Sequence, residues 1–274
     1  MHYDLHSHST VSDGDLTPTE LLTRAAEQGV DVLALTDHDT CAGIAEAQLA
    51  AQEMSIELIA GIEFSAQWGR RGIHILGLNV DVHSVVLQRA IAEQQSVRVV
   101  RGERIAERLS RIGIVGALAG AQAVAGASVL GRPHFAQFLI DQGRVKTVKE
   151  AFKKYLGAGK PGDVKNLWPE IKTVVKWIVA AGGVAVIAHP HKYKMTRTKL
   201  CALVDDFVVA GGQAIEVVSG IMPPGVADML ASIAHERNLF ASCGSDFHFP
   251  DARWQELGKF TRLPANCQPI WQLF

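Results

Sequence analysis

The chain has 274 residues, of which 48% are hydrophobic and 20% are charged, and its formal net charge is −1. This composition excludes a disordered chain, because the apolar content is high and the net charge is close to zero. It also disfavours a general electrostatic binder of nucleic acids, which needs an excess of basic residues. The composition does not exclude a locally basic groove. The length suits one large α/β domain or a domain that carries an insertion.

Two further features bear on where the protein acts. The longest uncharged apolar run covers residues 178–188, which is too short to span a bilayer, and the first residues lack the apolar stretch of a signal peptide. The four cysteines are far apart and form no CxxC pair. We therefore expect a cytoplasmic protein with reduced thiols, no membrane association and no stable complex with nucleic acid.

Short apolar runs alternate with helical patterns along the chain, which is typical of βα units around a mainly parallel sheet. The first helix is marked by Thr17 as capping residue, Pro18 in the first turn, Glu20 of a capping box and Gly29 as its stop. Further helices are expected over residues 43–54 and 84–112, and strands over residues 2–6, 30–35, 56–62, 73–80, 184–188, 214–218 and 239–243.

The long break between the fourth and fifth expected strands is mostly helical. We therefore predict a barrel-like α/β domain, formed by residues 1–97 and 166–274, that is interrupted by a helical insertion. The insertion covers residues 98–165 and is expected to act as a substrate-binding domain. The sequence contains no internal repeat and no low-complexity tract.

Histidine is frequent, with 11 residues, and several of them lie in tight sets with acidic residues. In the segment DLHSHS at residues 4–9, His6 and His8 are two apart on a strand, so their side chains point the same way and can converge on one ion. Asp13 follows in a loop from which it can reach the same place. For the histidine pair alone, the alternative is two ordinary surface side chains.

Similar side chains lie near the ends of the other predicted strands. They are TDHD at residues 36–39, Glu63 at the end of the third strand, His74 at the start of the fourth, GRPH at 131–134, HPH at 189–191 and GSDFH at 244–248. Taken alone, each motif has an ordinary alternative, such as a polar turn or a core histidine. Together they occupy the strand ends, where barrel enzymes carry their chemistry. Mixed imidazole and carboxylate ligands suit Mn, Fe or Zn, so we predict a multinuclear metal site.

In this order, the motifs HSHS, TDHD, the later Glu and His, GRPH, HP and GSDFH resemble those of the PHP (polymerase and histidinol phosphatase) family of phosphoesterases. The resemblance covers nearly the whole chain. More narrowly, the sequence resembles the bacterial stand-alone branch that acts on nucleoside 3′,5′-bisphosphates and on the 5′ ends of short RNAs, and that carries a helical insertion. The resemblance implies a distorted seven-stranded (β/α) barrel, which agrees with the count of predicted strands.

The resemblance also implies three divalent metal ions, which we expect to be manganese, with iron or zinc as alternatives. Carried over by motif position, the first ion is held by His6, His8, Glu63 and Asp246; the second shares Glu63 and adds His74 and His134; the third takes Asp13, His38 and His248. Family members often have histidine at the position of Asp13, which is nonetheless a competent ligand. His189 lies at a family site position whose role the resemblance leaves open.

Such a centre predicts hydrolysis of a phosphate ester by direct attack of a metal-bridging hydroxide, without a phospho-enzyme. His189 is the candidate general acid, and a purely structural role is the alternative. Asp37 is expected to orient the imidazole of His38, and a helix-capping role is the alternative.

Substrate binding is expected to involve cationic side chains. Arg132 is the first candidate for a phosphate clamp, because a guanidinium group fits phosphate oxygens with two parallel hydrogen bonds. Lys160, Lys165 and His191 are further candidates. The long helix carries Arg98, Arg101, Arg104, Arg108 and Arg111 on one face, which is either a solvated face or a basic wall that leads phosphates towards the barrel.

The leading functional hypothesis is removal of the 3′-phosphate from a nucleoside 3′,5′-bisphosphate to give the 5′-monophosphate, and this choice of substrate rests on the resemblance. The alternatives are 5′-3′ trimming of short RNA and hydrolysis of histidinol phosphate. An inactive PHP module that serves as an interaction domain is a hypothesis of another class, and a zinc-dependent amidohydrolase is a further one. The predicted ligand positions all hold competent ligand residues, which argues against the inactive module.

Overall fold

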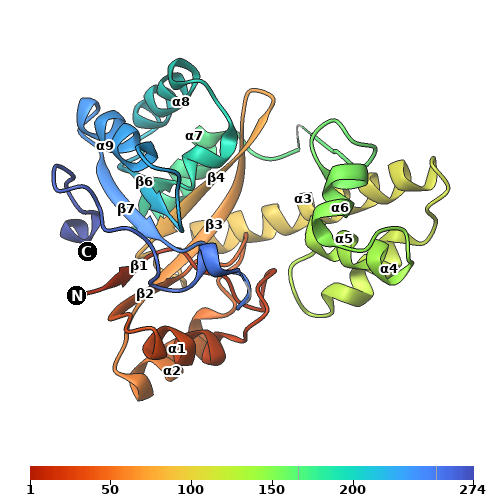
Figure 1. Cartoon of the computed structure of the whole chain (residues 1–274), viewed down its shortest axis with the longest axis horizontal. Helices are drawn as coiled ribbons and strands as arrows, with labels where there is room; N and C mark the ends of the chain where they lie inside the picture. Colours follow the sequence, from red (N-terminus) through yellow and green to blue (C-terminus); the bar gives the residue numbers. More distant parts are fainter. Residues whose placement is uncertain (166, 251) are drawn as a thin grey trace.

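A computed structural model gives the structure of the chain and describes residues 1–165, 167–250 and 252–274. Its centre is one seven-stranded sheet whose strands are neighbours in chain order (Figure 1). The strands are β1 (Tyr3–Asp4), β2 (Val32–Leu35), β3 (Glu57–Trp68), β4 (Arg71–Leu78), β5 (Val184–Ile187), β6 (Ala214–Ser219) and β7 (Phe240–Gly244). All seven overlap predicted strands.

The sheet curves until its two edges nearly meet. The pairs β3–β4 and β4–β5 are antiparallel, and the other neighbouring pairs are parallel. At the edges, the Leu5 N–H donates to the Cys243 carbonyl at 3.0 Å, and Ser7 forms a parallel bridge with Phe247. The predicted distorted seven-stranded barrel is thereby confirmed.

Helices surround this barrel and also form a separate lobe beside it. The α-helices are α1 (Pro18–Glu27), α2 (Ile44–Met54), α3 (Val85–Ser110), α4 (Ala117–Ala125), α5 (Arg132–Asp141), α6 (Val148–Ala151), α7 (Ile171–Ala180), α8 (Arg197–Val209) and α9 (Val226–Glu236). The short helical turns are η1 (Phe152–Leu156), η2 (Pro190–Tyr193), η3 (Arg253–Gln255) and η4 (Ile270–Leu273). None of the helices in the described ranges is both long and apolar enough to cross a membrane.

The first helix begins and ends as its sequence predicts. The Thr17 side chain accepts a hydrogen bond from the Glu20 N–H at 3.2 Å, and the Glu20 carboxylate accepts one from the Thr17 N–H at 2.8 Å. Gly29 follows the helix with a φ of +73°, a conformation that costs glycine little.

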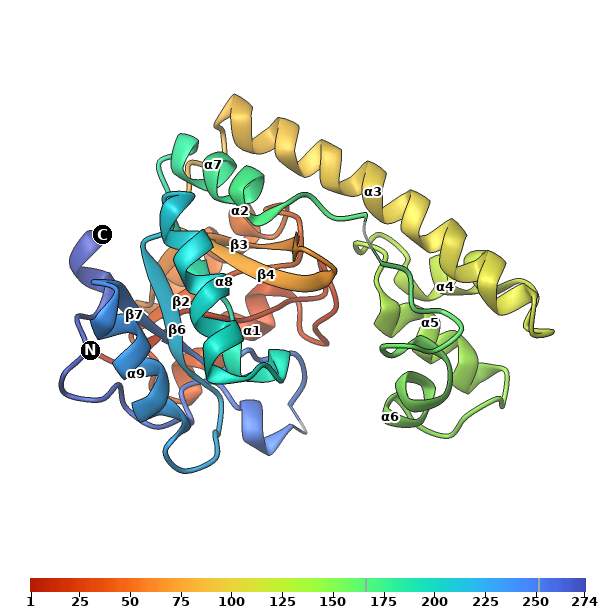
Figure 2. The same ribbon diagram turned by 90° about the horizontal axis from the view of Figure 1, so that it is seen from above.

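Helix α3 connects the barrel to the lobe (Figures 1 and 2). Its first half buries Leu87 and Ala90 in the core of the barrel, and its second half buries Ile105 and Leu109 in a second core. That second core belongs to the lobe formed by the end of α3 with α4, α5, α6 and η1. Residue 98 lies inside this continuous helix and residue 166 lies outside the described residues, so the domain limits at 98 and 165 stay a prediction.

Strand β3 is longer than its apolar pattern indicates. It continues to Trp68 and pairs with β4 through a tight turn at Gly69, which has a φ of +57°. Glu63 therefore lies within a strand rather than at its end: its backbone pairs with Leu76 of β4 on one side and forms a parallel bridge with His38 on the other.

Candidate metal centre

Imidazole and carboxylate side chains from most strands of the barrel meet at one end of it. They come from the segment after β1 (His6, His8, Asp13), the segment after β2 (His38), β3 (Glu63), β4 (His74), the segment after β5 (His189) and the segment after β7 (Asp246, His248). Their ligand atoms form four overlapping groups, within each of which all atoms lie within 4.8 Å of one another. The groups are His8, Asp13, His38 and His248; His6, Glu63 and His189; His6, His8 and Asp246; and His38, Glu63 and His74.

The buried carboxylate of Glu63 lies at the middle of this arrangement. Each of its two oxygens faces several imidazole nitrogens. The distances from Oε1 are 3.0 Å to His74 Nδ1, 3.0 Å to His189 Nε2 and 3.4 Å to His6 Nε2, and those from Oε2 are 2.8 Å to His38 Nδ1 and 3.3 Å to His8 Nε2. One carboxylate is thus positioned to bridge ions that different histidines hold.

The residues fit divalent ions by a direct geometric test. His6 Nε2 and His8 Nε2 are 3.2 Å apart, and each lies 3.4 Å from Asp246 Oδ1. Ligands that bind one ion at about 2.1 Å are themselves separated by about 3.0–3.4 Å, depending on the coordination geometry. In addition, Glu63 Oε2 and His38 Nδ1 are buried with no hydrogen-bond partner in the described residues, although they lie only 2.8 Å apart. A shared cation explains both observations.

Hydrogen bonds to the outer ring nitrogens prepare two histidines as ligands. His6 Nδ1 lies 3.0 Å from Glu216 Oε1, and His248 Nδ1 lies 2.9 Å from the Asp246 carbonyl. Because these oxygens only accept, the single proton of each ring in its neutral form lies on Nδ1, and Nε2 then has a lone pair towards the centre.

His134 lies in a different environment. Its Nδ1 accepts a hydrogen bond from the Gly131 N–H at 2.9 Å at the start of α5. In a neutral ring the proton then lies on Nε2, which leaves no lone pair for a metal there. His134 is absent from the four groups found among the described residues, whereas His189 Nε2 lies 3.0 Å from Glu63 Oε1, the oxygen that His74 Nδ1 also faces at 3.0 Å.

The charges of the centre are strongly coupled. Burial by itself would lower the pKa of His6, but the neighbouring carboxylates, first of all Glu216, raise it well above its usual range. Burial would raise the pKa of Glu63, but the surrounding imidazoles, first of all His74, hold it well below its usual range. For His8, burial and the neighbouring imidazoles together lower the pKa to about 3. The carboxylate is therefore ionised and His8 is neutral, as metal ligands need to be.

Asp37 stabilises the loop that carries the first ligands. Its carboxylate accepts hydrogen bonds from the Ser9 N–H and Ser9 hydroxyl, both at 2.7 Å, and from the Ser12 hydroxyl at 2.7 Å. Burial raises the pKa of Asp37 to about 6. These contacts hold the backbone next to His8, whereas the predicted role was to orient the imidazole of His38.

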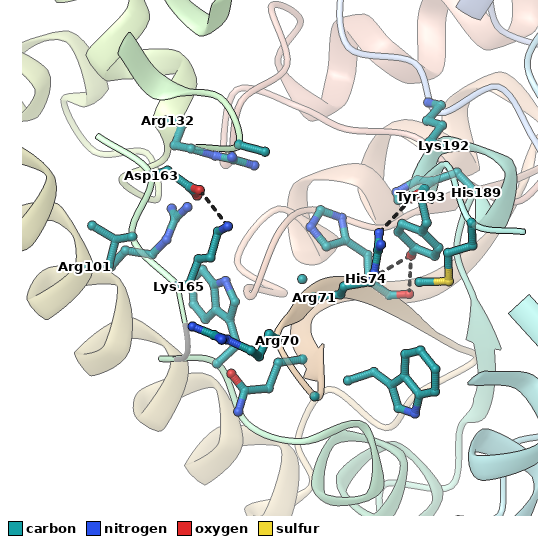
Figure 3. A pocket seen from close by; sticks show the side chains of 18 of the residues that line it. Arg70, Arg71, His74, Arg101, Arg132, Asp163, Lys165, His189, Lys192 and Tyr193 are labelled. Carbon is teal, nitrogen blue, oxygen red and sulfur yellow. Dashed lines mark hydrogen bonds and ion pairs between the residues drawn. The ribbon is translucent and has the colours of Figure 1, made fainter. Parts of the chain in front are cut away.

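A cavity of about 1130 Å³ opens from the centre into the space between the barrel and the lobe (Figure 3). His74 and His189 form part of its barrel wall, and Asp163 is an acidic residue in its lining. The cationic residues that line it are Arg70, Arg71, Arg101, Arg132, Lys165, Lys192 and Lys199. Arg132 and Lys165, which the sequence analysis named as candidates for substrate binding, thus line this cavity. Lys160 lies in an adjoining hollow, and His191 is not part of the described lining.

Comparisons with known proteins agree with this geometry. Residues 4–164 match the family described as PHP domain. The chain belongs to the PHP family. It is 47% identical over 272 residues to a 5′-3′ exoribonuclease of Haemophilus influenzae, covering 99% of this chain and 98% of that one. It is 43% identical over 270 residues to a 3′,5′-nucleoside bisphosphate phosphatase of Chromobacterium violaceum, covering 98% and 95%.

A solved structure also has a fold similar to that of this PHP protein. It is described as an amidohydrolase from Chromobacterium violaceum with bound sulfate and no metal, and it has a TM-score of 0.92 at 42% identity. The match covers 99% of this chain and 95% of the other chain. Membership of the PHP family makes this protein a hydrolase of phosphoric esters, as the motifs predicted.

The sequence analysis missed two residues of this PHP centre. Glu216 on β6 is fully buried and binds both His6 and the His189 N–H, the latter at 2.5 Å. The Lys192 ammonium group, which follows the His189 motif, contacts the Asp246 carboxylate. Glu216 could have been predicted from the sequence, because it is a lone acidic residue in the apolar strand AIEVVS. A buried carboxylate without a partner is costly there, as it is at Glu63.

Proposed function

We propose that this protein removes the 3′-phosphate from nucleoside 3′,5′-bisphosphates and leaves the 5′-monophosphate. The observation that carries the proposal is the cationic cavity, which begins at the histidine and carboxylate centre and is large enough for a nucleotide. A substrate with two phosphate groups matches a site that has metal ligands on one wall and guanidinium groups on the other. The relative from Chromobacterium violaceum that is named 3′,5′-nucleoside bisphosphate phosphatase supports this choice.

We further propose that the centre holds three ions, manganese in the first place and iron or zinc as alternatives. The first ion takes His6, His8, Asp246 and Glu63; the second takes Glu63, His74 and His189; the third takes Asp13, His38 and His248. His189 replaces His134 in this set, because His189 Nε2 faces Glu63. When bound, such ions lower the pKa of water and neutralise charge on the phosphoryl group.

The protein's own side chains position the ligands and the substrate. Glu216 orients the ring of His6, and the Asp246 carbonyl orients the ring of His248. Lys192 contacts Asp246 at the edge of the cavity, where its charge attracts a phosphate. His189 is better placed as a ligand than as the general acid that its motif predicted, since its Nε2 lies 3.0 Å from a buried carboxylate oxygen.

A second candidate function is 5′-3′ hydrolysis of short RNA. The relative from Haemophilus influenzae bears this name, and a specific feature of the structure favours it. Beside the main cavity lies a hollow of about 390 Å³ whose lining includes Arg70, Arg108, Lys160 and Lys165. Arg70 and Lys165 line both spaces. A chain longer than one nucleotide can place its next phosphate there.

Lys160→Ala tests whether this hollow serves longer substrates. We expect about a 3- to 10-fold lower kcat/KM for a 5′-phosphorylated RNA of five nucleotides, a weaker salt dependence, and no change for a nucleoside bisphosphate. Lys153→Ala, an exposed lysine of η1, is the matched control. Equal activity of Lys160→Ala and the control on RNA would assign Lys160 to the solvated surface.

The proposed function is tested by phosphate release from the manganese-loaded protein. The substrates are a nucleoside 3′,5′-bisphosphate, 3′- and 5′-monophosphates, short 5′-phosphorylated RNA and histidinol phosphate. We expect the bisphosphate to give the highest kcat/KM. A preference for histidinol phosphate would overturn the nucleotide substrate, and silence towards all substrates with metals bound would favour an interaction module.

We also propose that the protein acts in the cytoplasm. Cys41 and Cys243 are free and buried, and burial raises the pKa of the Cys41 thiol to about 12 and that of Cys243 further still. Thiols of this kind are inert and suit a reducing compartment.

A further inference from the structure

Arg98 of helix α3 is a buried cation that bridges the barrel and the lobe. It is 7% exposed and does not belong to the described lining of the cavity. Its Nε donates to Asp39 Oδ2 at 2.7 Å, its Nη1 donates to the Leu130 carbonyl at 3.0 Å, and its Nη2 donates to the Ser65 hydroxyl oxygen at 3.3 Å. One guanidinium group thus joins three segments: the residues after β2, strand β3 and the lobe segment that leads into α5.

Asp39, the anionic partner of Arg98, directly follows the candidate metal ligand His38. Its carboxylate is fully buried, and Oδ1 accepts hydrogen bonds from the Ser65 N–H at 2.7 Å and from Gln94 Nε2 at 2.8 Å. Its backbone has a φ of +53°, which residues other than glycine seldom adopt, so the surrounding contacts have to hold it there. Gln94 and Arg98 lie one turn apart on α3 and supply two of these contacts. Helix α3 therefore fixes the backbone that carries the His38 imidazole.

The loop that carries Asp13 contacts the lobe as well. The Ser128 hydroxyl donates to the Thr10 carbonyl, and the Val129 N–H donates to the Val11 carbonyl at 3.1 Å. Both donors belong to the lobe segment between α4 and α5, which α3 also binds. In Figures 1 and 2, the segment between β1 and α1 reaches from the barrel towards this part of the lobe.

The two loops that the lobe contacts supply ligand atoms to the same group. Asp13 Oδ1 lies 3.8 Å from His38 Nε2 and 3.5 Å from His248 Nε2, and all three residues belong to one of the four groups. Because each loop supplies one ligand, the affinity of the group for an ion depends on the distance between the loops. The lobe binds both loops and thereby contributes to that distance.

We propose that Arg98 is a positioning residue for the third ion, and that docking of the lobe and binding of this ion stabilise each other. The proposal rests on the proposed function, in which the third ion takes Asp13, His38 and His248. The lobe then does more than line the cavity, because through Arg98 and residues 128–130 it holds two ligand loops in place. Such coupling is reciprocal: the factor by which lobe docking strengthens ion binding is the factor by which the ion strengthens docking.

The first test titrates the metal-free full chain with manganese and measures ion binding by calorimetry. Arg98→Met is compared with the wild type and with Arg104→Met, which removes an exposed arginine of the same helix. For Arg98→Met we expect the third ion to bind about 10-fold or more weakly, whereas the other two ions keep their affinity within about twofold. Arg98→Lys restores part of the loss, because lysine keeps a charge beside Asp39 but cannot reach the Leu130 carbonyl at the same time.

Hydrogen exchange measures the other side of the coupling. In the wild type, manganese is expected to slow exchange of the Val129 amide about 10-fold, since this N–H donates to the loop that carries Asp13. In Arg98→Met we expect this protection by manganese to fall to about twofold or less. A residue that only stabilises the fold would instead raise the exchange rate equally with and without manganese.

Ser128→Ala tests the same coupling from the lobe and carries the test if Arg98→Met does not fold. It removes a half-buried hydroxyl that contacts the Thr10 carbonyl. The matched control Ser110→Ala removes an exposed hydroxyl at the end of α3. We expect Ser128→Ala to weaken binding of the third ion about threefold and the control to leave it unchanged. Equal affinities of these two variants would overturn the proposal.

The number of bound ions and the affinity of each decide the outcome. Arg98→Met with wild-type affinity for the third ion, or with the same loss for all three ions, would overturn the proposal. A wild type that binds only two ions would overturn it together with the arrangement proposed for the ions. None of these titrations contains a substrate, so hydrolysis is judged separately. A wild type that hydrolyses no nucleotide and still shows the coupling would contradict the proposed function and support the role of Arg98.

Discussion

Glu63→Gln is expected to lower phosphate release on the order of 10³-fold and to lower the number of bound metal ions. The reason is that the two oxygens of Glu63 face the imidazoles of five histidines at 2.8–3.4 Å. Glutamine has the same shape, but it has no charge and only one acceptor oxygen, so it cannot bridge two cations. Metal content by plasma mass spectrometry and the rate of phosphate release measure the two effects.

A control on the same strand makes this result specific. Glu57→Gln changes an exposed carboxylate at the start of β3 and is expected to leave metal content and rate unchanged. If Glu63→Gln retains both the full metal content and the full rate, then Glu63 is no bridging ligand and the arrangement proposed for the ions is wrong.

His248→Ala is expected to remove one of the three ions that we propose and to lower turnover by about 100-fold or more. His248 Nε2 lies 3.5 Å from Asp13 Oδ1, and the His248 ring stacks on His8 with ring centres 4.2 Å apart. Burial would raise the pKa of Asp13, but His38 first and then His248 hold it below its usual range. Alanine therefore removes a ligand and part of the electrostatic support for an ionised Asp13.

The matched control is His83→Ala, which removes an exposed histidine that belongs to none of the four groups of ligand atoms. We expect it to keep the metal content and the turnover of the wild type. A His248→Ala protein with three ions and normal turnover would contradict the site assigned to Asp13, His38 and His248.

Local signals in the sequence were sufficient to predict the elements of the fold. Thr17, Pro18, Glu20 and Gly29 mark the ends of α1 by hydrogen bonds and backbone angles that depend only on near neighbours. The seven strands follow from short apolar runs, because each run needs burial on both faces of a parallel sheet. The length of the β3–β4 hairpin was not predicted. Strand β3 continues past its apolar run to Trp68, because its pairing with β4, rather than its apolar pattern, sets its length.

The residue types of the candidate metal ligands could also be predicted. Which of them lie close enough to share one ion could be predicted less well. Histidines and acids at strand ends converge whenever the strands close into a barrel, so His6, His38 and Asp246 were expected to lie together. The replacement of His134 by His189 that we propose for the second ion could not be predicted from the sequence. It depends on a hydrogen bond at the start of α5 and on the position of Glu63, 126 residues from His189.

The sequence by itself therefore determined the barrel, the insertion and the chemical type of the centre, because these depend on patterns of neighbouring residues. Only the tertiary structure decided which side chains are paired. Arg98 and Arg101 have the same residue type and lie on the same helix face, yet the first forms an ion pair with Asp39, whereas the Nε of the second has no hydrogen-bond partner in the described chain. The physical reason is that burial and pairing arise between segments that meet only when the lobe packs against the barrel, and no local pattern encodes that contact.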